Sequence, residues 1–247
     1  MVLTAYGLGA WVTSLPLMEY WKHRATLDYL LNIKLNVHYV LPGVFESNPY
    51  PRGVNGSLWT IPLEVRCYVV MALAGLLGLM RYRGVWMLLI AAYLVWFMTK
   101  GNADVTGKVN YGRELSAYFF AGSALYLLQP RWERQPAAWL SIASASAIAL
   151  WTGGWHHSAL LVLLPLLVLY IGTRSTAVVR RFGRWGDPSY GIYLIAYPAQ
   201  QTVIQFLWPE LGFSGTLVLA TAITVTLAYA SWHGVEKIAM RLKPRRQ

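Results

Sequence analysis

The chain has 247 residues, of which 56% are hydrophobic and only 13% are charged. A soluble domain usually carries about 25% charged residues, so the composition excludes an ordinary soluble fold and predicts an all-α, polytopic integral membrane helical bundle. The net charge of +11 does not indicate nucleic acid, because the basic residues stand in short gaps between apolar runs. We therefore expect the lipid bilayer as a partner, no nucleic acid, and one transmembrane domain over residues 1–247.

Eight apolar segments are candidates for membrane-spanning helices, since a helix needs about 20 apolar residues to cross the hydrocarbon core of a bilayer. The candidates are residues 2–18, 59–80, 84–99, 114–128, 137–152, 158–173, 188–207 and 214–233. Pro62 falls in a first helical turn, where its missing N–H costs nothing. Pro198 falls inside a span, where we expect it to kink the helix and free a backbone carbonyl.

The distribution of Lys and Arg predicts the orientation of the chain. Most of the 21 basic residues follow the second, fourth, sixth and eighth apolar segments, and basic loops stay on the cytoplasmic side. Both termini are then cytoplasmic, and the long segment 19–57 is an extracytoplasmic loop. Its prolines and glycines indicate a structured loop rather than a helix, and a loop of this length is more often functional than filler.

Glu64, at the outer mouth of the second apolar segment, is the candidate catalytic residue. An ionisable side chain at the edge of a span is costly unless it has a partner or a task. One interpretation is structural, because the helix dipole favours a carboxylate in a first turn. The other is functional, with Glu64 orienting a catalytic group or a sugar hydroxyl. The residue alone leaves both interpretations open.

The same outer mouth combines hydrogen-bonding groups with an aromatic plane, from Asn55, Ser57, Trp59 and Thr60. Such a set suits a sugar ring and equally suits an interfacial anchor. We take Asn55 and Trp59 as candidate substrate-binding residues. Tyr190 and Tyr193, from the seventh segment, are weaker candidates to line the same interior, because tyrosines at such positions are more often packing residues.

Arg180, Arg181 and Arg184 occupy the longest cytoplasmic gap and are the candidates for binding a phosphorylated donor such as coenzyme A. Basic clusters beside spans also bind anionic lipid, and that alternative stays open. The five histidines and the single cysteine do not form a converging ligand set with the few carboxylates, so no metal site is predicted.

Several stretches resemble the membrane-bound acyltransferase family 3. Residues 55–68, Asn-Gly-Ser-Leu-Trp-Thr-Ile-Pro-Leu-Glu-Val-Arg-Cys-Tyr, resemble its Leu-Trp signature followed by Glu and an aromatic residue. Residues 187–198 resemble its late Ser-Tyr-Gly-x-Tyr-Leu-x-x-x-Pro motif. Residues 41–51 look like the outer loop of one bacterial branch, and residues 235–237 resemble the C-terminal Val-Glu-Lys. The resemblance covers the whole chain.

The resemblance implies a bundle of ten helices in the bacterial cytoplasmic membrane. It implies transfer of acyl groups, often acetyl, from cytoplasmic acyl-CoA to hydroxyls of cell-surface or lipid-linked glycans, with no bound cofactor. The family's general base is a His in its first helix, and basic residues between its second and third helices are linked to donor binding. Met1 stands where the third helix would begin, so the resemblance predicts an N-terminally truncated chain. A late start codon, a degraded gene or a second subunit would each explain the missing base.

Two alternatives stay open beside this hypothesis. A transporter of a glycan-linked substrate predicts internal repeats and broken helices at matching places in two halves. The sequence has no repeat and one clear break, at Pro198. A non-catalytic remnant predicts indifference to Glu64→Gln. The hypothesis that we carry forward is a membrane O-acyltransferase.

Overall fold

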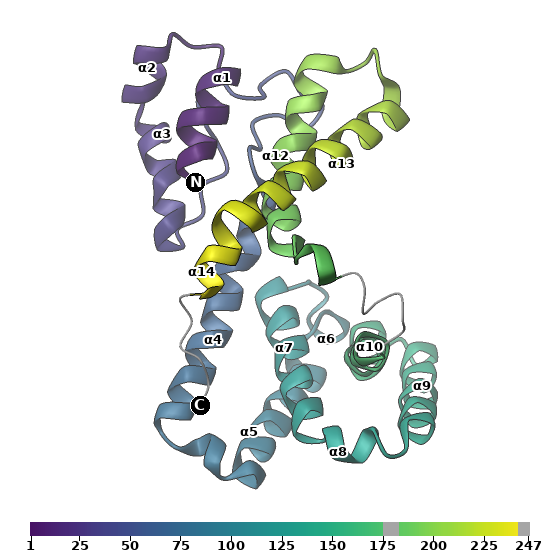
Figure 1. The fold of residues 1–247 in the computed structure, drawn as a ribbon. Helices are drawn as coiled ribbons and strands as arrows, with labels where there is room; N and C mark the ends of the chain where they lie inside the picture. The colour runs from purple at the N-terminus through teal and green to yellow at the C-terminus, as the bar shows by residue number, and fades with distance from the viewer. Residues whose placement is uncertain (175–182, 242–247) are drawn as a thin grey trace. The chain divides into compact units, whose positions relative to one another are not determined.

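The computed structural model describes residues 1–174 and 183–241 (Figure 1). These residues form helices joined by turns and contain no β-strand, which confirms the all-α prediction. The chain divides into two compact units, one of residues 1–62 and 177–247 and the other of residues 63–176. They are called unit 1 and unit 2 below.

Unit 1 is built from short helices before residue 60 and from a long helical hairpin near the C-terminus (Figure 1). Its elements are η1 (Leu3–Gly9), α1 (Ala10–Val12), α2 (Leu17–Lys22), α3 (Arg24–Tyr29), η2 (Leu30–Lys34), η3 (Gly56–Thr60), η6 (Gly183–Trp185), α12 (Ser189–Leu207), α13 (Gly212–Ser231), η7 (Trp232–Glu236) and α14 (Lys237–Arg241). α12 and α13 pack closely at Gly191, where a Cβ atom would lie 3.0 Å from the backbone of Ala228. Small residues allow membrane helices to approach in this way.

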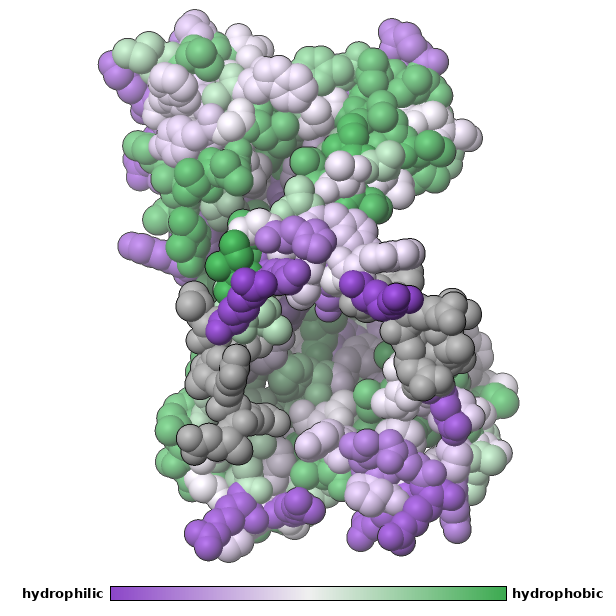
Figure 2. All heavy atoms as spheres, viewed as in Figure 1, coloured by the Kyte–Doolittle hydropathy of each residue, from purple (hydrophilic) through white to green (hydrophobic). Residues whose placement is uncertain are grey.

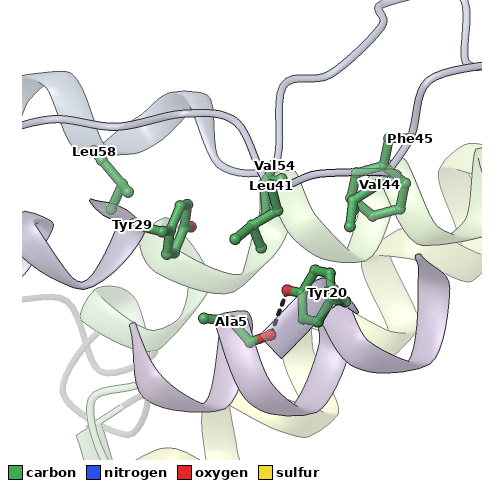
Figure 3. Packing of buried hydrophobic residues seen from close by; sticks show 8 residues of the cluster. All are labelled: Ala5, Tyr20, Tyr29, Leu41, Val44, Phe45, Val54 and Leu58. Atoms are coloured by element: carbon green, nitrogen blue, oxygen red, sulfur yellow. Dashed lines mark hydrogen bonds between the residues drawn. The ribbon is translucent and has the colours of Figure 1, made fainter. Parts of the chain in front are cut away.

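The core of unit 1 joins the N-terminal helices to the loop that follows them. Figure 3 shows Tyr20, Tyr29 and Leu41 among its fully buried residues. The hydroxyl of Tyr20 donates a hydrogen bond of 2.5 Å to the carbonyl oxygen of Ala5. Gly9 makes room for this ring, because a Cβ atom there would stand 2.0 Å from the Tyr20 hydroxyl oxygen. The buried tyrosine thus fixes α2 against the first helix.

The predictions for the first 57 residues need two corrections. The first apolar segment, expected to be helical over 2–18, ends its helix at Val12, because Thr13 takes an extended ψ of 141° and its hydroxyl donates to Pro42 O at 2.8 Å. Segment 19–57, expected to be a loop without a helix, contains α2, α3 and η2. This helical run ends at Lys34, because Leu35 takes a left-handed φ of 64°. The side-chain nitrogen of Asn32 donates to the carbonyl oxygens of Tyr29 and His38 and so ties the end of the run to the chain that follows. The remainder, up to η3, is irregular.

Unit 2 consists of consecutive helices that pack through small and aromatic residues. Its elements are α4 (Ile61–Leu76), whose first two residues belong to unit 1, η4 (Leu79–Arg81), α5 (Arg83–Trp96), η5 (Phe97–Gly101), α6 (Ala103–Thr106), α7 (Tyr111–Leu127), α8 (Gln129–Trp132), α9 (Pro136–Thr152) and α10 (His156–Thr173). Trp86 and Ile90 of α5 pack on Ala74 of α4. Pro62 lies in the first turn of α4, as predicted.

Four helical stretches of the described residues are long and apolar enough to cross a membrane. They are Gly56–Leu76, Arg83–Thr106, His156–Thr173 and Gly212–Arg241. At most 22% of each apolar window is buried within the protein, so most of these side chains need a lipid environment. Figure 2 shows hydrophobic residues over the α12–α13 hairpin and hydrophilic residues over the turn around α8. The structure supports an integral membrane protein, and the count of eight spans stays a prediction.

Candidate functional site

A cleft of unit 1 lies between the loop of residues 39–53, η3 and α12, and its volume is about 990 Å³. Aromatic rings, hydroxyls and side-chain amides line it: Tyr39, Val40, Tyr50, Pro51, Arg52, Gly53, Gly56, Ser57, Trp59, Thr60, Tyr193, Tyr197, Gln200, Gln201 and Ile204. Among the residues that the structure describes, Arg52 is the one charged residue in this lining. The pKa of Tyr39 is raised above its ordinary value, mainly by burial and to a smaller extent by the nearby Tyr50. This phenol is therefore neutral and able to donate a hydrogen bond.

Hydrogen bonds of Asn55 join η3, which forms one wall of the cleft, to α12. The side-chain nitrogen of Asn55 donates to Leu194 O at 2.8 Å, and its side-chain oxygen accepts from Ser57 N at 3.0 Å. Leu194 O is the carbonyl that a backbone N–H at position 198 would bond, and Pro198 has none. The predicted freed carbonyl therefore exists and Asn55 satisfies it. Asn55 is buried behind the lining rather than part of it.

Tyr193 of α12 reaches the same wall from inside the cleft. Its hydroxyl donates to Ser57 O at 2.8 Å and shares a short hydrogen bond with the hydroxyl of Thr60. Trp59 lies between Ser57 and Thr60 in the sequence, and 37% of its surface is exposed. It also lines the cleft. The structure therefore brings two of the predicted substrate-binding residues, Trp59 and Tyr193, into one cleft.

The opposite wall, residues 48–53, is held by Gln201, which the sequence analysis missed. The side-chain nitrogen of Gln201 donates to Tyr50 O at 2.9 Å and to Gly53 O at 2.8 Å. Its side-chain oxygen accepts from Asn48 at 3.1 Å. Both amide side chains are buried. The available signal was a neutral polar residue within an apolar helix three positions after Pro198, which indicates an internal partner.

Tyr197 forms an aromatic surface over two glycines of the loop. A Cβ atom on Gly53 would lie 2.8 Å from the Tyr197 hydroxyl, and one on Gly56 would lie 2.8 Å from its ring. Tyr50 meets the same ring edge-on, with the centroids 6.4 Å apart and the planes at 82°. Rigid aromatic faces beside hydroxyls and amides can stack on the apolar face of a sugar while bonding its hydroxyl groups.

A second polar cluster lies in unit 2 and caps α10. The carboxylate of Asp104 accepts the backbone N–H of His157 at 3.0 Å and that of Ser158 at 2.9 Å. His157 Nδ1 lies 2.9 Å from Glu114 Oε1. Asn102 donates to the Ser158 hydroxyl at 2.7 Å. The cluster satisfies the first N–H groups of a long helix. In residues 1–174 and 183–241, no group of three or more His, Cys, Asp or Glu could hold a metal ion.

Comparison with known proteins identifies the chemistry to which this fold is related. Residues 4–233 match the acyltransferase domain of acyltransferase family 3. The chain belongs to this family. It is also similar to a protein named O-acetyl transferase from Shigella phage Sf6, with 26% identity over 245 residues, which cover 95% of this chain and 71% of the phage protein. No solved structure matches the chain.

Glu64, Tyr190 and Arg184, three further predicted site residues of this family 3 acyltransferase, are not part of the cleft lining. Glu64 is exposed in the first turn of α4, four positions after Thr60. Tyr190 is 58% exposed on the first turn of α12. Arg184 is exposed in η6, whereas Arg180 and Arg181 lie outside the described residues. The catalytic, substrate-binding and donor-binding roles of these residues stay predictions.

The start of α12 agrees with the sequence analysis. The Asp187 carboxylate accepts the backbone N–H of Ser189 at 3.1 Å. Hydrogen bonds from the side chain and backbone of Ser189 lower the pKa of Asp187 below its ordinary value. The helix begins at Ser189, one position after the start of the predicted segment 188–207, and its register places Tyr193, Tyr197 and Gln201 four residues apart on one face.

Proposed function

We propose that this chain transfers an acyl group, acetyl in the simplest case, from acyl-CoA to a hydroxyl of a cell-surface or lipid-linked glycan. Membership of family 3 supports the acyl transfer, and the name of the phage relative supports an O-acetyl product. The observation that carries the glycan acceptor is the cleft of unit 1, where Trp59 and Tyr197 offer aromatic surfaces beside the amide of Gln200. Such lining suits a sugar better than an apolar chain.

The reaction joins the oxygen of a sugar hydroxyl to the carbonyl carbon of the thioester. The new C–O ester bond forms as the C–S bond breaks, and the hydroxyl proton ends on the thiol of coenzyme A. A sugar hydroxyl is a weak nucleophile, so its proton must pass to a base as the bond forms. In our proposal the Glu64 carboxylate receives this proton, directly or through a group that it orients. Glu64 is exposed in the first turn of α4, so solvent can carry the proton away once it has been transferred.

The donor side of the proposal uses the cytoplasmic arginines. Arg180, Arg181 and Arg184 would hold the phosphates of acyl-CoA, since guanidinium groups bind phosphate oxygens in pairs. This assignment follows the predicted orientation, with both termini on the cytoplasmic side of the bacterial inner membrane. Acyl-CoA is then a substrate that enters from the cytoplasm, and the glycan is bound at the extracytoplasmic end of α12.

The test is acetyl transfer from radiolabelled acetyl-CoA to extracted bacterial glycans, with the full chain in membranes. We expect Glu64→Gln to lower kcat by about 100-fold or more, the usual effect of losing a catalytic acid or base. Glu19→Gln is the matched control, because Glu19 is also an exposed glutamate in a first helical turn. Full activity in Glu64→Gln would contradict the catalytic assignment, and the absence of any labelled glycan with the wild-type chain would contradict the function.

A further inference from the structure

We infer that Arg52 is an anion-binding residue of the cleft and that the acceptor carries a carboxylate or phosphate group beside the sugar that is acylated. This inference rests on the proposed function, because it names the class of glycan that the same cleft would accept. The described lining of the cleft contains tyrosines, a tryptophan, glutamines and hydroxyls, and Arg52 is the one charged side chain among these residues. A single cation among neutral groups selects for an anion at one position of the ligand.

The guanidinium of Arg52 is not neutralised by the residues that the structure describes. The ion pairs found among these residues are Arg24 with Asp28 and His157 with Glu114. No Asp or Glu in residues 1–174 and 183–241 lines the cleft. Arg52 is also exposed, so a ligand can reach it from solvent. A planar guanidinium presents two parallel N–H donors, which match the geometry of carboxylate and phosphate oxygens.

The backbone at Arg52 is held in a conformation that arginine disfavours. Its φ is 64°, in the left-handed region that glycine adopts more readily. The Arg52 N–H donates to Phe45 O at 3.0 Å. Backbone strain of this kind persists where the surrounding structure imposes it, and it is found often at binding sites.

Two buried side-chain amides, Gln201 of α12 and Asn48 of the loop, fix the backbone on both sides of Arg52. Gln201 bonds the carbonyl oxygens of Tyr50 and Gly53, which bracket Arg52 in the sequence. Asn48, at the start of the same turn, bonds both the side chain and the backbone carbonyl of Gln201. An arginine whose backbone is fixed loses less freedom on binding, so it contributes more selectively to recognition.

The test measures binding of three probes by calorimetry to the full chain in phosphatidylcholine nanodiscs. The probes are a disaccharide ending in a uronic acid, its carboxyl-reduced neutral form, and the neutral disaccharide carrying a 1-phosphate. We expect at least one anionic probe to bind about tenfold more tightly than the neutral one, as for a charge-assisted hydrogen bond. Arg52→Gln should abolish the difference, and Arg52→Lys should keep part of it.

Matched variants separate recognition from folding. Arg24→Gln makes the same change at an exposed arginine of the same unit outside the lining, and it should leave all three affinities unchanged. Arg52→Gly removes the side chain and relieves the left-handed conformation, so its Tm should equal or exceed that of the wild type while the preference for anions is lost. A Tm that falls in both Arg52→Gln and Arg52→Gly would overturn the inference in favour of a structural role.

Three further outcomes would also overturn it. Equal binding of anionic and neutral probes to the wild type rejects the anion site but leaves the glycan cleft standing, provided that Trp59→Ala weakens both. If phosphatidylglycerol in the nanodiscs removes the preference, a lipid headgroup is the anion that Arg52 binds. Binding of no probe at all would reject the glycan cleft and, with it, this inference.

Discussion

The side-chain nitrogen of Asn55 donates a hydrogen bond of 2.8 Å to the carbonyl oxygen of Leu194, across 139 positions of the sequence. This carbonyl lacks its normal helical donor because residue 198 is a proline. The side-chain amide of Asn55 thus supplies the hydrogen bond that Pro198 cannot donate within α12. The pair determines where η3 begins and therefore where the Trp59 side of the cleft stands.

Replacing Asn55 by alanine tests how much the η3 wall of the cleft depends on the side-chain amide of this residue. We expect Asn55→Ala to lower the free energy of unfolding by about 1–3 kcal/mol, because a buried carbonyl loses its donor. In a Pro198→Ala background the loss should shrink by about 1 kcal/mol, since the new N–H can bond Leu194 O. Thermal unfolding in detergent measures both, with the exposed Asn36→Ala as the control. Equal losses in the two backgrounds would show that Pro198 and Asn55 are not coupled.

Gln201 should affect acceptor binding more than donor binding. Gln201→Met keeps the volume but removes both hydrogen bonds that fix residues 50–53. We expect KM for the glycan to rise about tenfold while KM for acyl-CoA stays unchanged, together with a loss of about 2 kcal/mol in stability. Gln205→Met, one helical turn further along α12 and outside the lining, is the control. An equal rise in both KM values would indicate general unfolding instead.

Asp104 should stabilise unit 2 without acting on the cleft. Asp104→Ala leaves the first N–H groups of α10 without their acceptor, and we expect a loss of about 1–2 kcal/mol. Asp28→Ala, which removes only an exposed pair with Arg24, should cost less than about 1 kcal/mol. Unfolding curves compare the two. A change in acceptor KM for Asp104→Ala would refute a purely structural role.

The raised pKa of the buried Tyr20 predicts how the free energy of unfolding changes at alkaline pH. Burial raises the pKa of Tyr20 from its ordinary value of 10.0 to about 12. The unfolded chain then ionises this phenol first, so wild-type stability should fall as the pH rises from about 10 to about 12. Tyr20→Phe should show a smaller fall across that window and a loss of about 1 kcal/mol at neutral pH, where the bond to Ala5 O is gone. Denaturation at pH 8, 10 and 11 tests this, with the exposed Tyr82→Phe expected to match the wild type.

The predicted helix boundaries succeeded where a local residue fixes them. Pro62 marks the first turn of α4, and Asp187 precedes α12, because a proline or a capping acid acts on the backbone within a few positions. The first helix was predicted too long, because Thr13 breaks it through a contact with Pro42 that is 29 positions away. Contacts at such distances leave no periodic signal in the sequence.

In the candidate site, too, some residues could be predicted from local patterns and others could be found only from the fold. Trp59 and Tyr193 were chosen from local patterns, and the fold brings both into the cleft lining. Asn55 was chosen as a ligand for substrate, whereas in the structure its amide bonds η3 and α12. Gln201 and Arg52 were missed: a polar residue within an apolar helix indicates that Gln201 has an internal partner, but only the fold shows that this partner is the loop around Arg52.

The sequence by itself determined the class of this protein, because the length and composition of apolar segments are sums over local residues that need no partner. It also carried the family resemblance, whose motifs are contiguous stretches. Only the tertiary structure decided that the carbonyl freed by Pro198 is bonded by Asn55, and that Gln201 holds the loop around Arg52. Those bonds join residues about 140 to 150 positions apart, and such pairs exist only once folding has brought a buried donor and acceptor together.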